Sequence, residues 1–195
     1  MNPDDPRAQR TRTRLRAAIL HLAARRDPAA LTMAAVARQA EVNRATVYQH
    51  YPDLDSLLTD AMEDAVTHLA HAAALCPLDA PRDHAPAPLL DLFGHVAANA
   101  ALYQRMLGTQ GSARFITRIR HGVTTALTDR FTQGHRPPCP PGVPVDVHAA
   151  YLAGALTGVI AHWLTERPAD PPHDIALAFW RLFRPAGAPA TNTPP

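Results

Sequence analysis

The sequence predicts an all-α fold made of an N-terminal three-helix domain and a larger C-terminal helical domain. Apolar residues recur at helical spacing along most of the chain, and no stretch of useful length alternates as a strand does. Segments rich in proline and glycine separate these periodic stretches and mark loops. The chain has 195 residues, of which 47% are hydrophobic, so it can bury a sizeable core. We expect domains over residues 7–52 and 53–183, and a disordered proline-rich tail over 184–195.

The first predicted helix is amphipathic and basic. Leu15, Ile19 and Leu22 recur at i, i+4 and i+7 and form one apolar face. Seven arginines and no acidic residue lie between Arg7 and Arg26, although the formal net charge of the chain is only +2. A helix of this kind can lie along a phosphate backbone. A solvated N-terminal arm is an equal alternative for Arg7 and Arg10.

Residues 32–51 predict two short helices joined by a tight turn, the layout of a helix-turn-helix DNA-binding motif. Thr32 is expected to cap the first helix and Asn43 the second, each by accepting from a free backbone N–H. Pro52 ends the second helix, because the residue before a proline is pushed out of the α region. With Val47 and Tyr51 pointing inward, six side chains of this helix remain available to another molecule: Arg44, Ala45, Thr46, Tyr48, Gln49 and His50.

These residues resemble the DNA-binding motif of the tetracycline-repressor (TetR) family of bacterial transcriptional regulators. The matching positions are Thr32, Ala40, Val42, Asn43, Thr46, Val47, Tyr48, His50 and Tyr51, followed by Asp55, Leu57 and Leu58. Two positions depart from the family pattern. Glu41 replaces the usual glycine of the turn, which costs about 1 kcal/mol if its φ is positive. Leu54 replaces a lysine that many relatives place near a DNA phosphate.

The resemblance implies a DNA-binding site made of Thr32, Asn43, Arg44, Ala45, Thr46, Tyr48, Gln49 and His50. It implies that Tyr48 and His50 contact the DNA backbone. Arg44, Ala45 and Gln49 are placed to face base edges, where glutamine can pair with adenine and arginine with guanine. Ordinary packed helices would not need polar side chains at these exposed positions.

The remaining helices are separated by clear breaks. In order, we expect a long helix from Asp53 to Leu75, a loop from Pro77 to Pro88, a helix from Leu89 to Leu107, a break from Gly108 to Gly111, a helix capped by Ser112 and running through Phe131, a non-helical segment from Gly134 to Pro144, and helices from Asp146 to Glu166 and Pro172 to Leu182.

The helix from Asp146 to Glu166 carries a stripe of small residues, which allows close approach of another helix. Its sequence AGALTGVIAHWL also resembles the dimerising helix of the TetR family. Two such helices from each subunit can form a twofold four-helix interface. The expected interface residues are Ala150, Gly154, Gly158, Ala161, Ile175, Phe179 and Leu182. The alternative is that the stripe packs inside one subunit.

The middle helices carry a candidate site for a small-molecule effector. His95, Asn99 and Tyr103 are spaced four apart, so they share one face of a continuous helix. The family resemblance implies an effector cavity here, lined by Phe93, His95, Asn99, Tyr103, Met106, Phe115 and Ile119. The polar stripe could instead be the solvated side of the helix. His68 and His71 could bind a metal with Cys76, but eleven histidines make a chance pair expected.

The sequence therefore predicts a homodimeric, ligand-responsive transcriptional regulator, expected to be a repressor that binds a near-palindromic operator. We expect no enzyme activity, because no phosphate-binding glycine loop, nucleophile elbow or paired zinc motif is present, and we expect no cofactor. A signal peptide and a membrane span are also absent from the pattern, which indicates a cytoplasmic protein. The alternative is a helical small-molecule binding protein whose DNA reader is inactive.

Overall fold

A computed structural model of the chain describes residues 6–26, 30–77, 80–108 and 111–183. Within these residues the predicted all-α class is confirmed, with ten helices and no strand. The helices are α1 (Pro6–Ala23), α2 (Met33–Ala40), α3 (Arg44–His50), α4 (Leu54–Ala61), α5 (Glu63–Leu75), α6 (Ala87–Ala98), α7 (Ala100–Leu107), α8 (Ala113–Thr132), α9 (Val145–Glu166) and α10 (Pro172–Phe183). The predicted tail, residues 184–195, lies outside the described residues.

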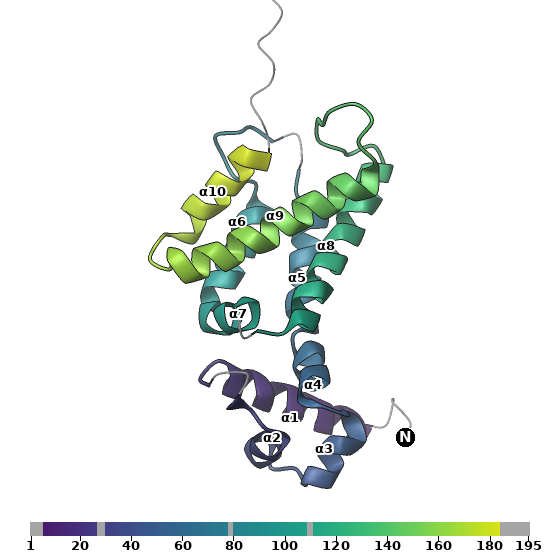
Figure 1. Ribbon diagram of the computed structural model, residues 1–195, viewed down its shortest axis with the longest axis vertical. Coiled ribbons are helices and arrows are strands. Elements are labelled where there is room, and N and C mark those ends of the chain that lie inside the picture. Colours follow the sequence, from purple (N-terminus) through teal and green to yellow (C-terminus); the bar gives the residue numbers. More distant parts are fainter. Residues whose placement is uncertain (1–5, 27–29, 78–79, 109–110, 184–195) are drawn as a thin grey trace, which may run out of the picture.

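The first three helices form a small unit at one end of the molecule (Figure 1). Leu15, Ile19 and Val36 have no exposed surface and make the core between α1 and α2, and Val47 brings α3 onto it. The predicted caps are present at both short helices. The Thr32 hydroxyl accepts from the N–H of Ala35 at 3.2 Å, and the Asn43 side chain accepts from the N–H of Ala45 at 2.9 Å. These local hydrogen bonds fix where each helix begins.

The predicted helix from Asp53 to Leu75 is two helices, α4 and α5, that meet at Met62. Met62 has φ −91° and ψ 2°, outside the helical range. Its N–H still bonds to the Leu58 carbonyl and its carbonyl accepts from Val66, each at 3.0 Å. Because these i to i−4 bonds continue through the irregular residue, the apolar spacing carried no signal of the change. The pair α4 and α5 links the N-terminal unit to the rest of the fold (Figure 1).

In the second domain α8 packs along both α5 and α9, while α6 packs between α5 and α10 (Figure 1). The short α7 lies at the end of this domain that faces the N-terminal unit, where it contacts α1. Large aromatic side chains fill the interior: Phe93, Tyr103, Phe115 and Trp180 each have 1% or less of their surface exposed.

The predicted helix from Leu89 to Leu107 is also divided, and it starts earlier than predicted. It begins at Ala87 because proline is tolerated in the first turn, where its missing N–H is not needed. It ends at Asn99, whose φ of −119° is not helical. The Asn99 side-chain amide donates to the His95 carbonyl at 2.9 Å, and Asn99 is exposed. The prediction that His95, Asn99 and Tyr103 form one polar face of a continuous helix is therefore wrong.

Among the described helices, α9 alone is long and apolar enough to cross a bilayer, judged by length and composition. The helix has 22 residues. In the fold its inner face, including Leu152, Leu156 and Trp163, is buried. Within the fold, 44% of the apolar window is buried inside the protein.

Candidate functional site

The outer face of α3 carries the side chains that the sequence analysis predicted to contact DNA. Arg44, Ala45, Tyr48 and Gln49 are exposed, and Thr46 and His50 are half-buried. On the opposite face of the segment, Val47 is fully buried and Tyr51 is 6% exposed. Tyr48 keeps 46% of its surface in water. An aromatic ring left exposed between polar side chains is available for contact with a partner.

Arg44 lies over the ring of Tyr48, one helical turn away. Its guanidinium carbon is 5.6 Å from the ring centroid, within the range of a cation–π interaction. One guanidinium nitrogen also donates to the Tyr48 hydroxyl at 3.4 Å. The two side chains therefore hold each other in place on the outer face of α3.

The turn between α2 and α3 adopts the left-handed conformation at Glu41, with φ 54° and ψ 44°. This is the conformation for which the family usually has glycine, so the glutamate accepts the conformational cost rather than avoiding it. The Glu41 N–H bonds to the Ala37 and Arg38 carbonyls and closes the C-terminus of α2. The turn keeps its geometry despite the unfavourable residue because these hydrogen bonds specify it.

Two arginines of α1 lie near the segment that holds α3, with Arg12 close to His50 and Arg14 close to Glu41. Arg10, Arg12 and Arg14 are exposed, and Arg14 is 3.1 Å from the Glu41 carboxylate. An exposed ion pair contributes less than about 1 kcal/mol, so Arg14 can exchange this carboxylate for a phosphate. Burial and, second, the charge of Arg12 lower the pKa of His50. The imidazole beside this arginine is therefore held in its neutral form at physiological pH.

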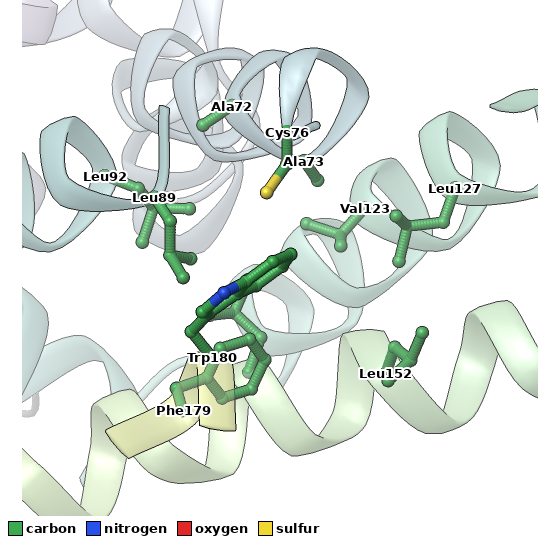
Figure 2. A pocket seen from close by; sticks show the side chains of 11 residues that line it. Ala72, Ala73, Cys76, Leu89, Leu92, Val123, Leu127, Leu152, Phe179 and Trp180 are labelled. Atoms are coloured by element: carbon green, nitrogen blue, oxygen red, sulfur yellow. The ribbon is translucent and has the colours of Figure 1, made fainter. Parts of the chain in front are cut away.

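A small apolar pocket lies in the second domain (Figure 2). It has a volume of about 40 Å³ and is enclosed by side chains from α5, α6, α8, α9 and α10. The lining residues are Ala72, Ala73, Cys76, Leu89, Leu92, Val123, Leu127, Leu152, Leu156, Phe179 and Trp180. The Trp180 indole donates to the Pro81 carbonyl at 2.7 Å, which satisfies its polar atom. None of the described residues that line this pocket is among the residues predicted to bind the effector.

The predicted effector residues lie nearer to the N-terminal unit. Phe93, Met106, Phe115 and Ile119 are part of the packed core, each with 1% or less exposure. The ring of His95 is half-buried against the edge of Tyr103, with centroids 5.9 Å apart.

His95 also stacks on His68 of α5 at 4.3 Å, a contact that the sequence did not indicate. Burial and the neighbouring His68 lower the pKa of His95, and burial raises the pKa of Tyr103.

The predicted interface residues lie on the outer faces of α9 and α10, with one exception. Ala150, Gly154 and Gly158 are exposed, and Leu182 is 78% exposed. Ala161 and Ile175 are half-buried. Phe179 is wrongly assigned, because it is only 8% exposed and lines the internal pocket.

Two large side chains that the sequence analysis did not select extend this outer face of α9. Val147 is 54% exposed and Tyr151 is 70% exposed. Their spacing from Gly154 and Gly158 is helical, so periodicity could have found them. Both side chains are available for contact with a partner at this face.

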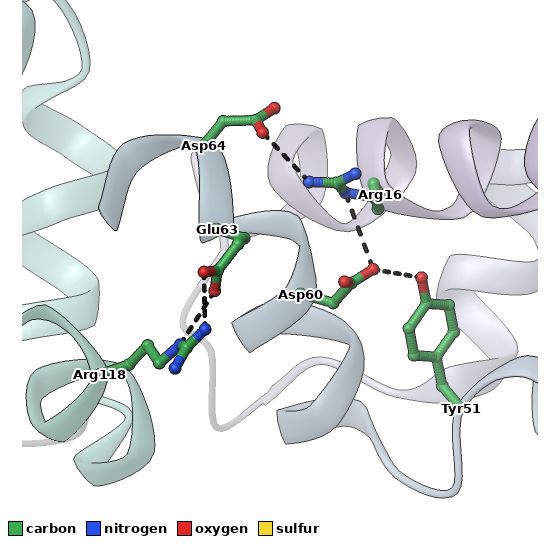
Figure 3. A network of polar contacts seen from close by, with 6 residues as sticks. All are labelled: Arg16, Tyr51, Asp60, Glu63, Asp64 and Arg118. Atoms are coloured by element: carbon green, nitrogen blue, oxygen red, sulfur yellow. Dashed lines mark hydrogen bonds and ion pairs between the residues drawn. The ribbon is translucent and has the colours of Figure 1, made fainter. Parts of the chain in front are cut away.

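A polar network joins the N-terminal unit to the second domain (Figure 3). Asp60 accepts from the Tyr51 hydroxyl at 2.5 Å and lies 3.8 Å from Arg16. One turn further, both carboxylate oxygens of Glu63 accept from Arg118 of α8, at 2.7 and 3.1 Å. The sequence analysis missed these pairs, because contacts between residues of different segments leave no periodic signal.

The possible metal ligands on α5 do not meet. His71 is exposed, His68 stacks on His95, and the Cys76 thiol lies in the apolar pocket. Burial raises the pKa of Cys76 to about 11, which disfavours the thiolate that a metal requires. Within the described part of the chain, no three metal-ligating side chains form a group that could hold an ion.

Comparison with known protein structures supports the same fold. A TetR-family regulator from Streptococcus agalactiae 2603V is 20% identical, with 93% of this chain and 97% of that chain covered and a TM-score of 0.68. A putative TetR-family regulator from Syntrophomonas wolfei is 13% identical, with 90% and 93% covered and a TM-score of 0.69. Thermus thermophilus FadR, a TetR-family repressor solved with lauroyl-CoA, is 17% identical, with 92% and 98% covered and a TM-score of 0.64. No curated protein matches this chain significantly.

Two family models match the chain in sequence. Residues 15–61 match the N-terminal model of the bacterial regulatory proteins of the tetR family. Residues 83–184, more than half of the chain, match a model of a transcriptional regulator C-terminal region. Regulators of this kind bind DNA through the helix-turn-helix and are not enzymes. The chain therefore belongs to the TetR family of bacterial transcriptional regulators.

Proposed function

We propose that this regulator is a ligand-responsive repressor that binds a near-palindromic operator as a homodimer in the bacterial cytoplasm. The observation that carries the DNA-binding part is the outer face of α3, where Arg44, Tyr48 and Gln49 are exposed beside the arginines of α1. A DNA-binding motif that had lost its function would not need exposed polar side chains at these positions. The alternative, a small-molecule binding protein with an inactive reader, is therefore the weaker candidate.

Sequence specificity is assigned to Arg44 and Gln49. Glutamine pairs with adenine and arginine with guanine in the major groove, each contributing about 1–3 kcal/mol of discrimination. Thr46, Tyr48 and His50 are assigned to the phosphate backbone, which sets affinity and register. Ala45 lies between them and offers a methyl group to a base. Thr32 and Asn43 hold the two helices in position through their caps.

Selection of bound sequences from random duplex DNA tests this assignment. The wild type should select a sequence with two half-sites, and Gln49→Ala should lose preference at one position in each half. A Gln49→Ala variant that weakens all sequences equally would show that Gln49 is not a reader. Binding should also weaken steeply between low and physiological salt, because arginine contacts to phosphates release counterions.

The dimer is assigned to the outer faces of α9 and α10. Apolar residues exposed there, including Val147, Tyr151 and Leu182, would be covered by the same faces of a second copy. A twofold arrangement of this kind places two recognition helices for successive major grooves about 34 Å apart. A near-palindromic operator follows from that symmetry.

The ligand response is assigned to the second domain, which holds the apolar pocket. The Thermus thermophilus relative is a repressor that binds lauroyl-CoA in its crystal structure, which supports both the repressor role and a small-molecule effector. Helices α4 and α5 contact both domains. A shift of this pair would therefore couple ligand binding in the second domain to the position of the DNA-binding domain. Coupling of about 1–3 kcal/mol would lower operator affinity 5- to 150-fold, and operator DNA would weaken effector binding by the same factor.

A further inference from the structure

Of the buried polar atoms in the second domain that have no hydrogen-bond partner among the described residues, two belong to side chains that contact the ring of His95. They are the Tyr103 hydroxyl oxygen and Nε2 of His68. Tyr103 is 1% exposed, and the ring of His95 contacts both residues, at 4.3 Å from His68 and 5.9 Å from Tyr103. Leaving a buried polar atom without a partner is costly, so such atoms in a native protein require an explanation.

In this polar cluster of His68, His95 and Tyr103, both histidines lie about one helical turn from residues that line the apolar pocket of Figure 2. His68 is four residues before Ala72 on α5, and His95 is three residues after Leu92 on α6. Residues three or four apart share a helix face, so each histidine continues the lining by one turn. The two helices are antiparallel, since α5 leads away from the N-terminal unit and α6 returns towards it (Figure 1). Both histidines therefore lie at the same end of the pocket.

The cluster and the pocket together have the chemistry of a site for an amphipathic acid. The Tyr103 hydroxyl can donate a hydrogen bond, and so can the N–H of each neutral imidazole. The walls beyond it are aliphatic and aromatic. We propose that this continuous site binds a medium-chain carboxylic acid, with the carboxylate at His68 and Tyr103 and the chain in the pocket.

This inference rests on the proposed function, because it names the chemical class of the effector. The two turns from His68 to Cys76 span about 12 Å, the length of a medium-chain acid. The pocket volume of about 40 Å³ accommodates only about three water-sized spheres. The pocket therefore has to widen before it can hold the chain of the acid.

Calorimetric titration of the full-length protein with sodium octanoate tests the proposal. Octanoate should bind, methyl octanoate should bind much more weakly, and affinity should rise about fourfold with each methylene from butanoate to octanoate. Tyr103→Phe removes only the hydroxyl and keeps the ring packing, so it should weaken octanoate binding by roughly tenfold or more without lowering the melting temperature. His68→Gln should also weaken it. The matched control is His71→Gln, at an exposed position on the same helix, which should bind as the wild type does.

Absence of octanoate binding, equal binding of the methyl ester, or unchanged binding by both Tyr103→Phe and His68→Gln would overturn the proposal. Operator binding, measured separately, distinguishes this failure from failure of the proposed function. A protein that binds a selected operator but not octanoate overturns the ligand class alone. A protein that binds octanoate as described but no DNA supports the site and overturns the repressor role.

Discussion

Glu41 is the residue at which the chain departs most from low-energy backbone geometry. It is the single described non-glycine residue with positive φ. A side chain in this conformation costs about 1–2 kcal/mol relative to glycine, because Cβ approaches the following carbonyl oxygen. The ion pair with Arg14 does not offset this cost, since the side chains of Arg14 and Glu41 are 52% and 85% exposed and exposed pairs contribute little to stability. The turn is therefore held by the capping hydrogen bonds of α2.

We expect Glu41→Gly to raise the free energy of unfolding by about 1 kcal/mol, because glycine adopts positive φ without the Cβ contact. Urea denaturation measures the change. Glu41→Ala is the matched control, since it removes the same ion pair but keeps Cβ, and it should give no comparable gain. Equal stabilisation by alanine and glycine would show that backbone strain is not the cause.

At the scale of helices, close packing of α5 against α8 depends on Gly122. A Cβ at this position would lie 3.2 Å from Cγ1 of Val66 and 3.8 Å from Cβ of Ala70. The ion pair between Arg118 and Glu63 joins the same two helices, but its side chains are 48% and 36% exposed. Exposed pairs contribute little to stability, so the helix contact at Gly122 is the stronger determinant of this packing.

We expect Gly122→Leu to lower the free energy of unfolding by about 1–3 kcal/mol, because the added side chain must push α5 and α8 apart. Gly94→Leu on α6 is the control, since its Cβ would meet nothing within 4 Å. That variant should be neutral or more stable by up to about 1 kcal/mol, through better helix propensity. Thermal and urea unfolding would compare the pair. A Gly122→Leu protein as stable as Gly94→Leu would contradict the close-packing argument.

At the scale of the whole molecule, the proposed dimer depends on the exposed glycines of α9. A Cβ at Gly154 or Gly158 would meet nothing within 4 Å in the single subunit. We therefore expect Gly154→Leu and Gly158→Leu to fold normally but to keep the paired helices apart. Analytical ultracentrifugation should find monomers, and tight operator binding should be lost with the dimer. Intact dimers for both variants would place the interface elsewhere.

Acid sensitivity is a second property of the whole molecule. Burial is the main cause that lowers the pKa of His50, His95 and His148, with nearby Arg12, His68 and Arg136 respectively adding to it. The unfolded chain therefore binds more protons than the folded protein, and stability is lost as pH falls below the unfolded pKa of about 6.5. We expect a lower melting temperature at pH 5.5 than at pH 7.5.

His148→Phe should reduce this pH dependence, because the substituted ring cannot take up a proton. Its ring would keep the contact with Phe131, and Arg136 would keep the Val143 carbonyl as an acceptor. Calorimetric melting of both proteins at the two pH values measures the difference. Equal melting temperatures of the wild type at pH 5.5 and 7.5 would rule out the buried histidines as a source of acid lability.

The sequence by itself determined the features that rest on local hydrogen bonds and on burial of one helix face. Thr32, Asn43 and Ser112 were predicted as caps and act as caps, because a capping bond joins residues two or three positions apart. Val47 and Tyr51 were predicted to be inside, because the helical repeat leaves few ways to bury an apolar face in so short a segment. The family and the exposed face of α3 followed from the same short motif.

Only the tertiary structure decided which apolar face meets which neighbour. Phe179 and Leu182 both fit the helical repeat of apolar residues in α10, but Phe179 lines the pocket and Leu182 is exposed. Which of them is buried depends on where α6 and α9 lie. Asn99 continues an apolar and polar pattern that a helix could follow, but its side chain caps the preceding helix instead. The contacts of His68 with His95 and of Glu63 with Arg118 join distant segments. Periodicity describes a single helix, so it contains no information on contacts that form only when helices pack.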